Sequence, residues 1–431
     1  MHLIPPSQDR LRNPDDVVDL DPRRAVLRFL VRTCHGESMG IIEQVEAALA
    51  CLDLAADLGA IVARDDEACL AFAARLDRET RLRPWAGRTL TVKDWIDVAG
   101  LPCDGTNTAP SGRVPNHDAS AVRRLHHVGA AVLAKTQAGV EHAFHGTCRH
   151  PYDPSRTPGA SSSGEAALIG RGASQFGLGS DSGGSIRLPA AWCGVVGFKP
   201  SFGLVPVTGH FPRVAGRSDG RTVIGPLASR LDDIIDILTV ISGPDGRDPD
   251  CVPVAIKDWR DVDISTLRIA VVDESSWRPA DSTVVAVRGA TALLHEAGAT
   301  IHESALPTHL DESLEITQRY WGRTGLSGFE VDRQLRDWDR FRIAITRASS
   351  NFDAVIGPVV ADIAPIARPI TGEDYVFTLP WSLTGWPAIS LPFGHDQATG
   401  LPTAVQIAAP QWDDHVVLAI ARWLEGRLRS E

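Results

Sequence analysis

Serine hydroxyls gather in one glycine-rich segment of the chain, residues 158–206, which contains PGASSSGEAALIG and LGSDSGGSIRLPAAWCG. Glycine loses more backbone freedom on folding than other residues, so it suits positions where the backbone turns tightly or approaches a ligand. A flexible linker is disfavoured because apolar residues such as Leu168, Phe176 and Phe198 interrupt the segment. A dinucleotide fingerprint is also disfavoured, since GLGSDSG lacks the G-x-G-x-x-G spacing. The segment therefore indicates hydroxyl chemistry in a packed site.

Three motifs taken together resemble the amidase signature family of serine hydrolases: TVKDWIDVAG, PGASSSGEAALIG and LGSDSGGSIRLPAAWCGVVGFKPSFGLVP. Similar segments on either side extend the resemblance over roughly residues 40–425. The resemblance implies a Ser-cisSer-Lys triad in which Ser185 attacks, Ser161 bridges and Lys93 is the terminal base. It also implies a cis peptide at Ser161. The oxyanion hole that it implies lies in the turn formed by Ser182, Gly183 and Gly184.

The chemistry of the residues agrees with this triad. A serine hydroxyl is a poor nucleophile without a base within hydrogen-bond reach, and a lysine accepts a proton only when it is neutral. Burial lowers the pKa of a lysine, and Lys93 has the apolar neighbours Val92, Trp95 and Ile96. Histidine is not required, and the chain has no G-x-S-x-G elbow. The two central glycines of the Ser182 turn let backbone N–H groups approach a developing oxyanion.

Other residues near these motifs have supporting roles in this interpretation. Asp181 and Arg187 flank the nucleophile turn, and the resemblance implies that they brace it by ion pairing. Four residues are candidates for substrate contact, although a structural role is favoured for the two histidines and a core position for the tryptophan: His142, His145, Ser162 and Trp386. The double-serine turn departs from the family's usual Gly-Gly-Ser-Ser-Gly-Gly, because it has Ala160 and Ser163.

The elements that must position these residues follow a β-α-β rhythm. A strand at 89–92 leads into Lys93, a helix that begins with Asp118 as N-cap ends at Gly129, and a second strand follows at 131–133. Further expected elements are helices at about 40–56, 65–81 and 282–296 and a strand at 267–272. This pattern predicts an α/β fold with a mixed, mainly parallel central sheet covered by helices on both faces. We expect a loosely held arm over 1–23 and one large domain over 24–431.

Composition excludes several functions. The 431 residues include 43 Lys and Arg against 54 Asp and Glu, a net charge of −11, which disfavours nucleic-acid binding. No apolar run is long enough for a membrane span, so we expect a cytoplasmic protein without membrane contact. The seven cysteines are scattered and never paired as CxxC, so neither a metal site nor a cofactor is predicted.

The sequence thus predicts an amidohydrolase that cleaves a carboxylic or carbamoyl amide C–N bond through an acyl-serine intermediate. The expected partner is a small-molecule amide, and homodimer formation is left open. Three alternatives remain: an esterase or acyl transferase on the same site, a glutamine-dependent amidotransferase subunit, and a catalytically silent binding module. Retention of Lys93, Ser161 and Ser185 disfavours the last of these.

Overall fold

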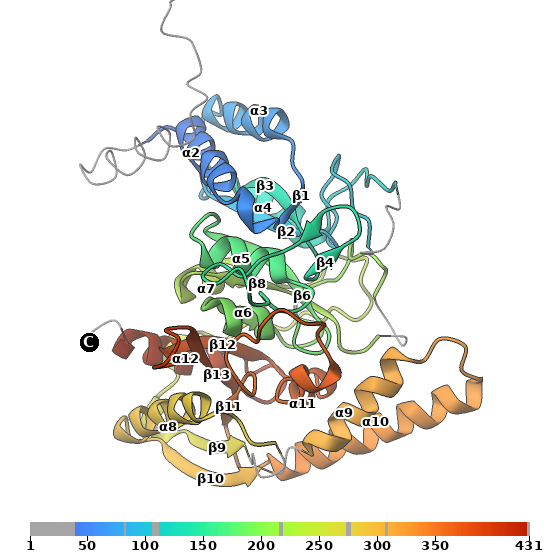
Figure 1. The fold of residues 1–431 in the computed structure, drawn as a ribbon, viewed down its shortest axis with the longest axis vertical. Helices are drawn as coiled ribbons and strands as arrows, with labels where there is room; N and C mark the ends of the chain where they lie inside the picture. Colours follow the sequence, from blue (N-terminus) through green and yellow to red (C-terminus); the bar gives the residue numbers. More distant parts are fainter. Residues whose placement is uncertain are drawn as a thin grey trace, which may run out of the picture.

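Helices cover a long central sheet in the computed structural model, which describes residues 39–81, 83–105, 112–214, 219–272, 277–306 and 309–428 (Figure 1). The α-helices are α2 (Ile41–Leu54), α3 (Asp66–Asp77), α4 (Ser120–Val128), α5 (Ser163–Gly170), α6 (Arg187–Cys193), α7 (Leu231–Ile241), α8 (Asp281–Glu296), α9 (Leu310–Trp321), α10 (Gly328–Ala348), α11 (Leu379–Leu383) and α12 (Asp414–Leu428). Short 3-10 helices are η2 (Ala56–Leu58), η4 (Trp259–Asp261), η5 (Ile264–Thr266) and η6 (Gly372–Tyr375).

The strands of the described residues form one sheet of eleven strands and one small hairpin. The large sheet has the order β1-β3-β2-β6-β8-β7-β12-β13-β11-β9-β10, and β4 pairs with β5. The strands are β1 (Ile61–Ala63), β2 (Thr89–Lys93), β3 (Ala131–Thr136), β4 (Glu141–His142), β5 (Gly146–Thr147), β6 (Phe176–Asp181), β7 (Val196–Lys199), β8 (Val223–Ala228), β9 (Arg268–Val272), β10 (Thr300–Leu306), β11 (Ala354–Pro358), β12 (Ala388–His395) and β13 (Pro402–Ala408).

Parallel pairing occurs in two blocks of the large sheet. Strand β2 pairs in parallel with β3 and β6, and β9 pairs in parallel with β10 and β11. These blocks contain the β-α-β units that the sequence predicts, and the α/β fold class with a mixed sheet is confirmed. The strands between the blocks pair antiparallel, in part because a short connection such as that from β12 to β13 can only form a hairpin. The prediction of a mainly parallel sheet therefore holds for the two blocks and not for the centre.

Side chains that alternate along the strands fill a core on each face of the sheet. In β9, Ile269 and Val271 pack in the cluster that includes α4, α7, α8 and α12. Ala270 and Val272 point to the opposite face and pack with α9, α10 and α11. Helices α5 and α6 pack together beside β8 through their own buried cluster. The sheet is thus covered on both faces, as the sequence predicts.

Strand ends bring the candidate residues together. Lys93 is the last residue of β2 and Asp181 is the last residue of β6. Because β2 and β6 are neighbouring parallel strands, their carboxyl ends meet at the same edge of the sheet. The chain after β6 turns at residues 182–186 directly into α6. This geometry places the Ser185 turn beside Lys93.

One predicted cap is wrong. Helix α4 has Ala119 as its N-cap, and the Asp118 carboxylate instead accepts a hydrogen bond from the Ala99 backbone N–H at 2.8 Å. A tertiary contact has therefore replaced the local cap that the sequence suggests. At the other end of α4, Gly129 has a φ of 105° and ends the helix, as predicted.

The hairpin of α9 and α10 projects from the rest of the molecule (Figure 1). Its helix α9 packs on α11 and η6, which lie next to the Ser185 turn. Among the described helices, none has both the length and the apolar character needed to cross a membrane. The predicted arm over 1–23 lies outside the described residues.

Candidate active site

The Lys93 amine is the centre of a compact polar cluster. Its Nζ lies 2.7 Å from the Ser161 Oγ and 2.8 Å from the Ser180 Oγ. The Ser180 carbonyl oxygen lies 3.4 Å from the same nitrogen. Two hydroxyls and one carbonyl thus surround the amine, and the structure brings Lys93 and Ser161 into direct contact.

The environment of Lys93 favours its neutral form. The side chain is fully buried, and burial lowers the pKa of Lys93 to about 7. The negative charges of Asp181, Glu165 and Asp94 oppose this shift, and the amine lies 4.4 Å from the centre of the Trp95 ring, which also favours the cation. Desolvation outweighs these attractions because no carboxylate in the described part of the chain bonds directly to the amine. At neutral pH a large fraction of Lys93 can therefore accept a proton.

Ser161 and Ser185 line the same pocket, which has a volume of about 460 Å³. Ser161 comes from the turn before α5 and Ser185 from the turn before α6. A side-chain hydrogen bond joins Ser185 to Tyr375, and burial raises the pKa of Tyr375 to about 12. The tyrosine therefore stays a neutral phenol, whose hydroxyl can donate a hydrogen bond to the Ser185 hydroxyl or accept one from it. The pocket gives a ligand access to both serine hydroxyls.

The glycines of the Ser185 turn are required by its geometry. Gly184 has a φ of 140°, and a Cβ there would lie 2.2 Å from the Thr378 Oγ1. The Thr378 Oγ1 lies 2.5 Å from the Gly183 carbonyl oxygen, which is its nearer acceptor, and 2.7 Å from the Tyr375 carbonyl oxygen. Among the described residues, no hydrogen-bond partner occupies the backbone N–H of Gly183 or Gly184. These two N–H groups remain available to a ligand.

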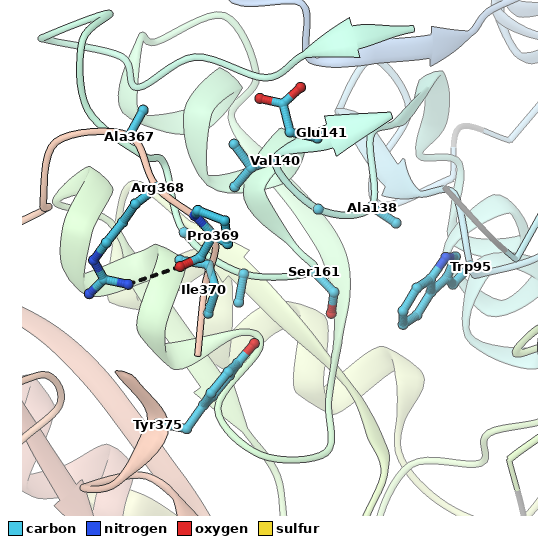
Figure 2. Close-up of a pocket in the computed structure, with 13 residues that line it drawn as sticks. Trp95, Ala138, Val140, Glu141, Ser161, Ala367, Arg368, Pro369, Ile370 and Tyr375 are labelled. Atoms are coloured by element: carbon cyan, nitrogen blue, oxygen red, sulfur yellow. Dashed lines mark hydrogen bonds between the residues drawn. The ribbon is translucent and has the colours of Figure 1, made fainter. Parts of the chain in front are cut away.

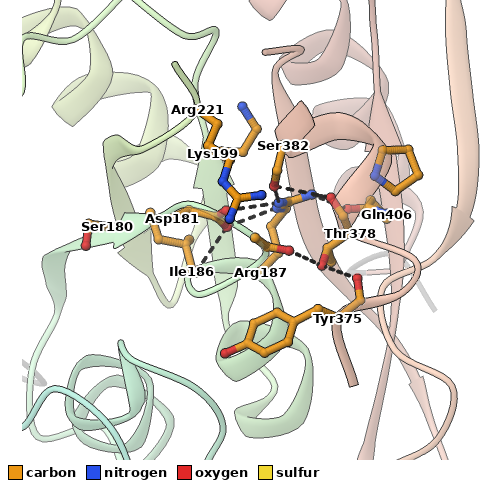
Figure 3. A network of polar contacts seen from close by, with 12 residues as sticks. Ser180, Asp181, Ile186, Arg187, Lys199, Arg221, Tyr375, Thr378, Ser382 and Gln406 are labelled. Carbon is orange, nitrogen blue, oxygen red and sulfur yellow. Dashed lines mark hydrogen bonds and ion pairs between the residues drawn. The ribbon is translucent and has the colours of Figure 1, made fainter. Parts of the chain in front are cut away.

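A buried ion pair braces the turn (Figure 3). Arg187 donates from Nε and Nη2 to the two Asp181 oxygens, both at 3.0 Å. Its remaining bonds go to the Thr378 carbonyl at 2.9 Å, Gln406 Oε1 at 2.8 Å and Ser382 Oγ at 2.7 Å. Burial alone would raise the pKa of Asp181, but the Arg187 charge and its hydrogen bonds hold that pKa below its usual value. The arrangement matches the structural support that the sequence predicts for this pair.

A second pocket, of about 590 Å³, meets the first at Ser161. Figure 2 shows Ser161 between Trp95 and Tyr375, and these three residues line both pockets. Most of the other lining residues are small or apolar: Ala138, Gly139, Val140, Gly159, Ala160, Ala367, Pro369 and Ile370. Arg368 also lines it, and its guanidinium is bonded to Asp374 at 2.6 and 2.9 Å. Space therefore exists on two sides of the Ser161 hydroxyl.

The four predicted substrate contacts line neither pocket. His142 is buried, and its Nδ1 accepts from the backbone N–H groups of Phe144 and His145, so it shapes its own loop. His145 is exposed, with its ring 4.5 Å from that of His142. Ser162 is buried and donates to the Ser180 carbonyl at 3.4 Å.

Trp386 lies in the core, which is the position that the sequence favoured. Its ring stacks on Trp381 at 5.4 Å between ring centres, and both side chains are buried. The predicted cis peptide at Ser161 is also absent, since the cis bond among the described residues is Phe211–Pro212. A trans bond is the default for a non-proline residue, because the cis form costs about 3–4 kcal/mol.

Several site residues were not predicted from the sequence. Ser180 stands within the motif SDSGGS, and its position one residue before Asp181 on β6 was the available signal. Glu165 follows the double-serine turn and accepts hydrogen bonds from the Thr91 and Thr136 hydroxyls at 2.6 and 2.7 Å. Burial raises the pKa of Glu165 to about 7. The remaining two, Tyr375 and His210, come from segments far along the chain.

No group of three or more His, Cys, Asp and Glu side chains in the described ranges is arranged to hold a metal ion. The polar groups that face the two serines are hydroxyls, the Lys93 amine and backbone N–H groups.

Comparisons with known proteins identify the family to which this chain is similar. The family model described as Amidase matches residues 43–327 and 329–418. A glutamyl-tRNA(Gln) amidotransferase subunit of Desulforudis audaxviator (strain MP104C) is 30% identical over 437 residues, covering 83% of this chain and 86% of that protein. The peptide amidase of Stenotrophomonas maltophilia superposes with a TM-score of 0.75 at 25% identity, covering 96% of this chain and 98% of that one.

A third relative shares the fold. The corresponding glutamyl-tRNA(Gln) amidotransferase subunit of Thermotoga maritima has a TM-score of 0.77 at 24% identity, and the match covers 94% of each chain. With a family match over most of its length, this chain belongs to the amidase signature family and is an amide-cleaving enzyme.

Proposed function

We propose that this enzyme hydrolyses its amide substrate through an acyl intermediate on Ser185, with Ser161 as proton relay and Lys93 as base. The observation that carries the proposal is the 2.7 Å contact between the Ser161 hydroxyl and a fully buried amine whose pKa is about 7. Ser185 lines the same pocket as Ser161. A base, a relay and a nucleophile are thus available in one place.

The proposed proton path starts at Ser185, which shares a pocket with Ser161, and ends at the Lys93 amine that Ser161 contacts. Ser185 attacks the amide carbonyl carbon as its proton passes to the Ser161 Oγ, while the Ser161 proton passes to the neutral Lys93 amine. The C–N bond of the tetrahedral intermediate then breaks, and the leaving amine takes a proton back from Lys93 through Ser161. Water then attacks the ester carbonyl carbon and gives a proton through Ser161 to Lys93. This proton returns through Ser161 to the Ser185 Oγ as the ester C–O bond breaks, which releases the carboxylic acid and restores the Ser185 hydroxyl.

The oxyanion of the tetrahedral intermediate is stabilised by the Ser182–Gly184 turn in this proposal. The unused N–H groups of Gly183 and Gly184 supply donors, and the Thr378 bond to the Gly183 carbonyl keeps the turn from reorganising. Donors that are fixed before the reaction are worth more than donors that must reorient.

The decisive experiment is Ser185→Ala assayed on a panel of aliphatic, aryl and ureido amides. Turnover is expected to fall by about 10³-fold or more while the fold is retained, because the nucleophile contributes little to packing. Ser265→Ala, which changes an exposed serine bonded to Asp263, is the matched control and should keep full activity. Activity of the Ser185 variant within about tenfold of wild type would reject the assignment.

The role of an amidotransferase subunit is the second candidate function, because curated relatives at 28–30% identity carry that name. Such a subunit releases ammonia from a primary amide. The two pockets that meet at Ser161 favour instead an amide with substituents on both sides of the scissile bond. Hydrolysis rates of N-substituted amides and of glutamine distinguish the two candidate functions. An enzyme that hydrolyses glutamine but no N-substituted amide would favour the amidotransferase role. A small-molecule amide is the substrate in this proposal.

A further inference from the structure

The Lys93 amine also belongs to a chain of polar contacts that leads away from Ser161. The Ser180 Oγ, 2.8 Å from the amine, lies 3.0 Å from the Nε2 of His210. The other ring nitrogen of His210, Nδ1, lies 2.8 Å from the Pro212 carbonyl oxygen. His210 is buried at the wall of the 460 Å³ pocket. The proposed mechanism makes no use of this histidine.

The Pro212 carbonyl fixes the tautomer of His210. A carbonyl oxygen only accepts hydrogen bonds, so Nδ1 must carry a proton. Burial lowers the pKa of His210 to about 4, so the ring is neutral and Nε2 has a free lone pair. The partner of Nε2 is the Ser180 hydroxyl, which therefore donates its only proton to the histidine.

The direction of the Ser180 bond sets that of the Lys93 bonds. Because its proton is used by His210, the Ser180 Oγ can only accept from the amine. A neutral amine has two N–H bonds and one lone pair. The two N–H bonds point to the Oγ and to the carbonyl oxygen of Ser180, at 2.8 and 3.4 Å. The lone pair is left for the Ser161 hydroxyl at 2.7 Å.

We propose that His210 is a positioning residue that, acting through Ser180, keeps the lone pair of neutral Lys93 directed at Ser161. Without His210, the Ser180 hydroxyl would be free to donate to the amine and would compete with Ser161 for its lone pair. The inference rests on the proposed function, in which Lys93 takes the Ser161 proton.

The charged surroundings assign any pH dependence to Lys93 and not to His210. The charges that act on His210 come from Lys93, Asp219 and Asp97. Those that act on Lys93 come from Asp181, Glu165 and Asp94. His210 therefore stays neutral between pH 6 and 9 in this proposal. Its removal should lower the plateau value of kcat/KM at high pH without adding a further pH-dependent step to the profile.

The test is a double-mutant cycle on kcat/KM at the alkaline plateau. His210→Leu should reduce kcat/KM by about 10–100-fold, and Ser180→Ala should also reduce it. In the Ser180→Ala background, His210→Leu should have no further effect, because the histidine acts only through Ser180. His210→Gln, whose amide oxygen can accept from Ser180, should recover most of the activity.

The matched control is His150→Leu. His150 is also buried, and its Nε2 lies 2.9 Å from the Trp192 carbonyl, but it lines neither pocket. This variant should lower the melting temperature while the rate per folded enzyme stays within about threefold of wild type. Loss of stability alone can then be separated from loss of positioning.

A second measurement does not depend on how the variants fold. The ¹⁵N shifts of the wild-type His210 ring should show a protonated Nδ1 and an unprotonated Nε2 from pH 6 to 9. A proton on Nε2 would overturn the inference. So would a loss of kcat/KM in the double variant equal to the product of the losses in His210→Leu and Ser180→Ala. If Ser185→Ala remains active, the proposed function fails instead, and the two failures are distinguishable.

Discussion

Lys93 and Lys199 have similarly lowered pKa values but very different contacts. Both side chains are fully buried, and burial lowers the pKa of each to about 7. For Lys199 the positive charge of Arg187 adds to this shift. The Lys199 amine, however, donates to the Pro200 carbonyl at 3.0 Å, whereas Lys93 contacts two hydroxyls that line a pocket.

A lowered lysine pKa therefore does not by itself identify a base. A neutral amine is useful to catalysis only where its lone pair faces a group that must lose a proton, and where a substrate can reach that group. In the proposed mechanism, Lys93 meets both conditions through Ser161. Lys199 lines neither pocket, so its low pKa is a consequence of burial and of the neighbouring Arg187.

The two lysines should differ most in how their replacement by methionine changes kcat/KM. Lys93→Met should reduce kcat/KM by about 10³-fold or more, because it removes the base while keeping the volume of the side chain. Lys199→Met removes an equally buried amine and should leave kcat/KM within about threefold of wild type. Steady-state assays of both variants across pH 5.5–10 provide the measurement.

The wild-type kcat/KM should rise with pH through an apparent pKa near 7, and this limb should vanish in Lys93→Met. The value belongs to the coupled unit of Lys93, Ser161 and Ser185. Equal rate losses in the two lysine variants would show that the contacts of Lys93 do not distinguish it.

The second effect concerns the ion pair that braces the nucleophile turn. Arg187→Met should lower the free energy of unfolding by about 3–5 kcal/mol, because it leaves the Asp181 carboxylate buried without its partner. Urea unfolding followed by circular dichroism measures this loss. The double variant Asp181→Leu with Arg187→Met should recover part of it, since no buried charge is left unpaired. A single variant as stable as wild type would show that the brace is dispensable.

Local sequence patterns predict several elements of the fold but not the contacts that form between distant segments. The strand before Lys93 and the glycine at the end of α4 follow from local patterns, and both are confirmed. The Asp118 cap failed because a tertiary bond to Ala99 competes with the local one. Tyr375 and His210 reach the site from remote segments, so no local spacing could indicate them.

The third effect is a change in how stability depends on pH. The pKa of Lys93 is lowered on folding, so the folded chain binds fewer protons than the unfolded chain between about pH 7 and the ordinary lysine value of about 10.4. The free energy of unfolding should therefore rise with pH in this window, and Lys199 contributes in the same direction.

Each methionine variant should lose part of that rise. Denaturant midpoints at pH 7 and 9.5 measure it, and the difference between the midpoints should be smaller in Lys93→Met and in Lys199→Met than in wild type. Glu165 acts below this window, because its raised pKa makes stability fall as pH rises from about 4.3 to 7. An unchanged slope in both variants would contradict the lowered lysine pKa values.

The smallest expected effect is that of metal removal. Dialysis against a strong chelator should leave kcat/KM unchanged, because the proposed base and oxyanion donors are the Lys93 amine and backbone N–H groups. Metal content is measured before and after dialysis. Activity that disappears and returns with added zinc would require a metal-dependent mechanism.

The most direct test of the central claim is to locate the covalent adduct of a fluorophosphonate probe by peptide mass spectrometry. The account predicts one modified residue, Ser185, with labelling abolished by Ser185→Ala, strongly slowed by Lys93→Met and little changed by Lys199→Met. An adduct on Ser161 or another serine, in an enzyme that still hydrolyses amides, would contradict it.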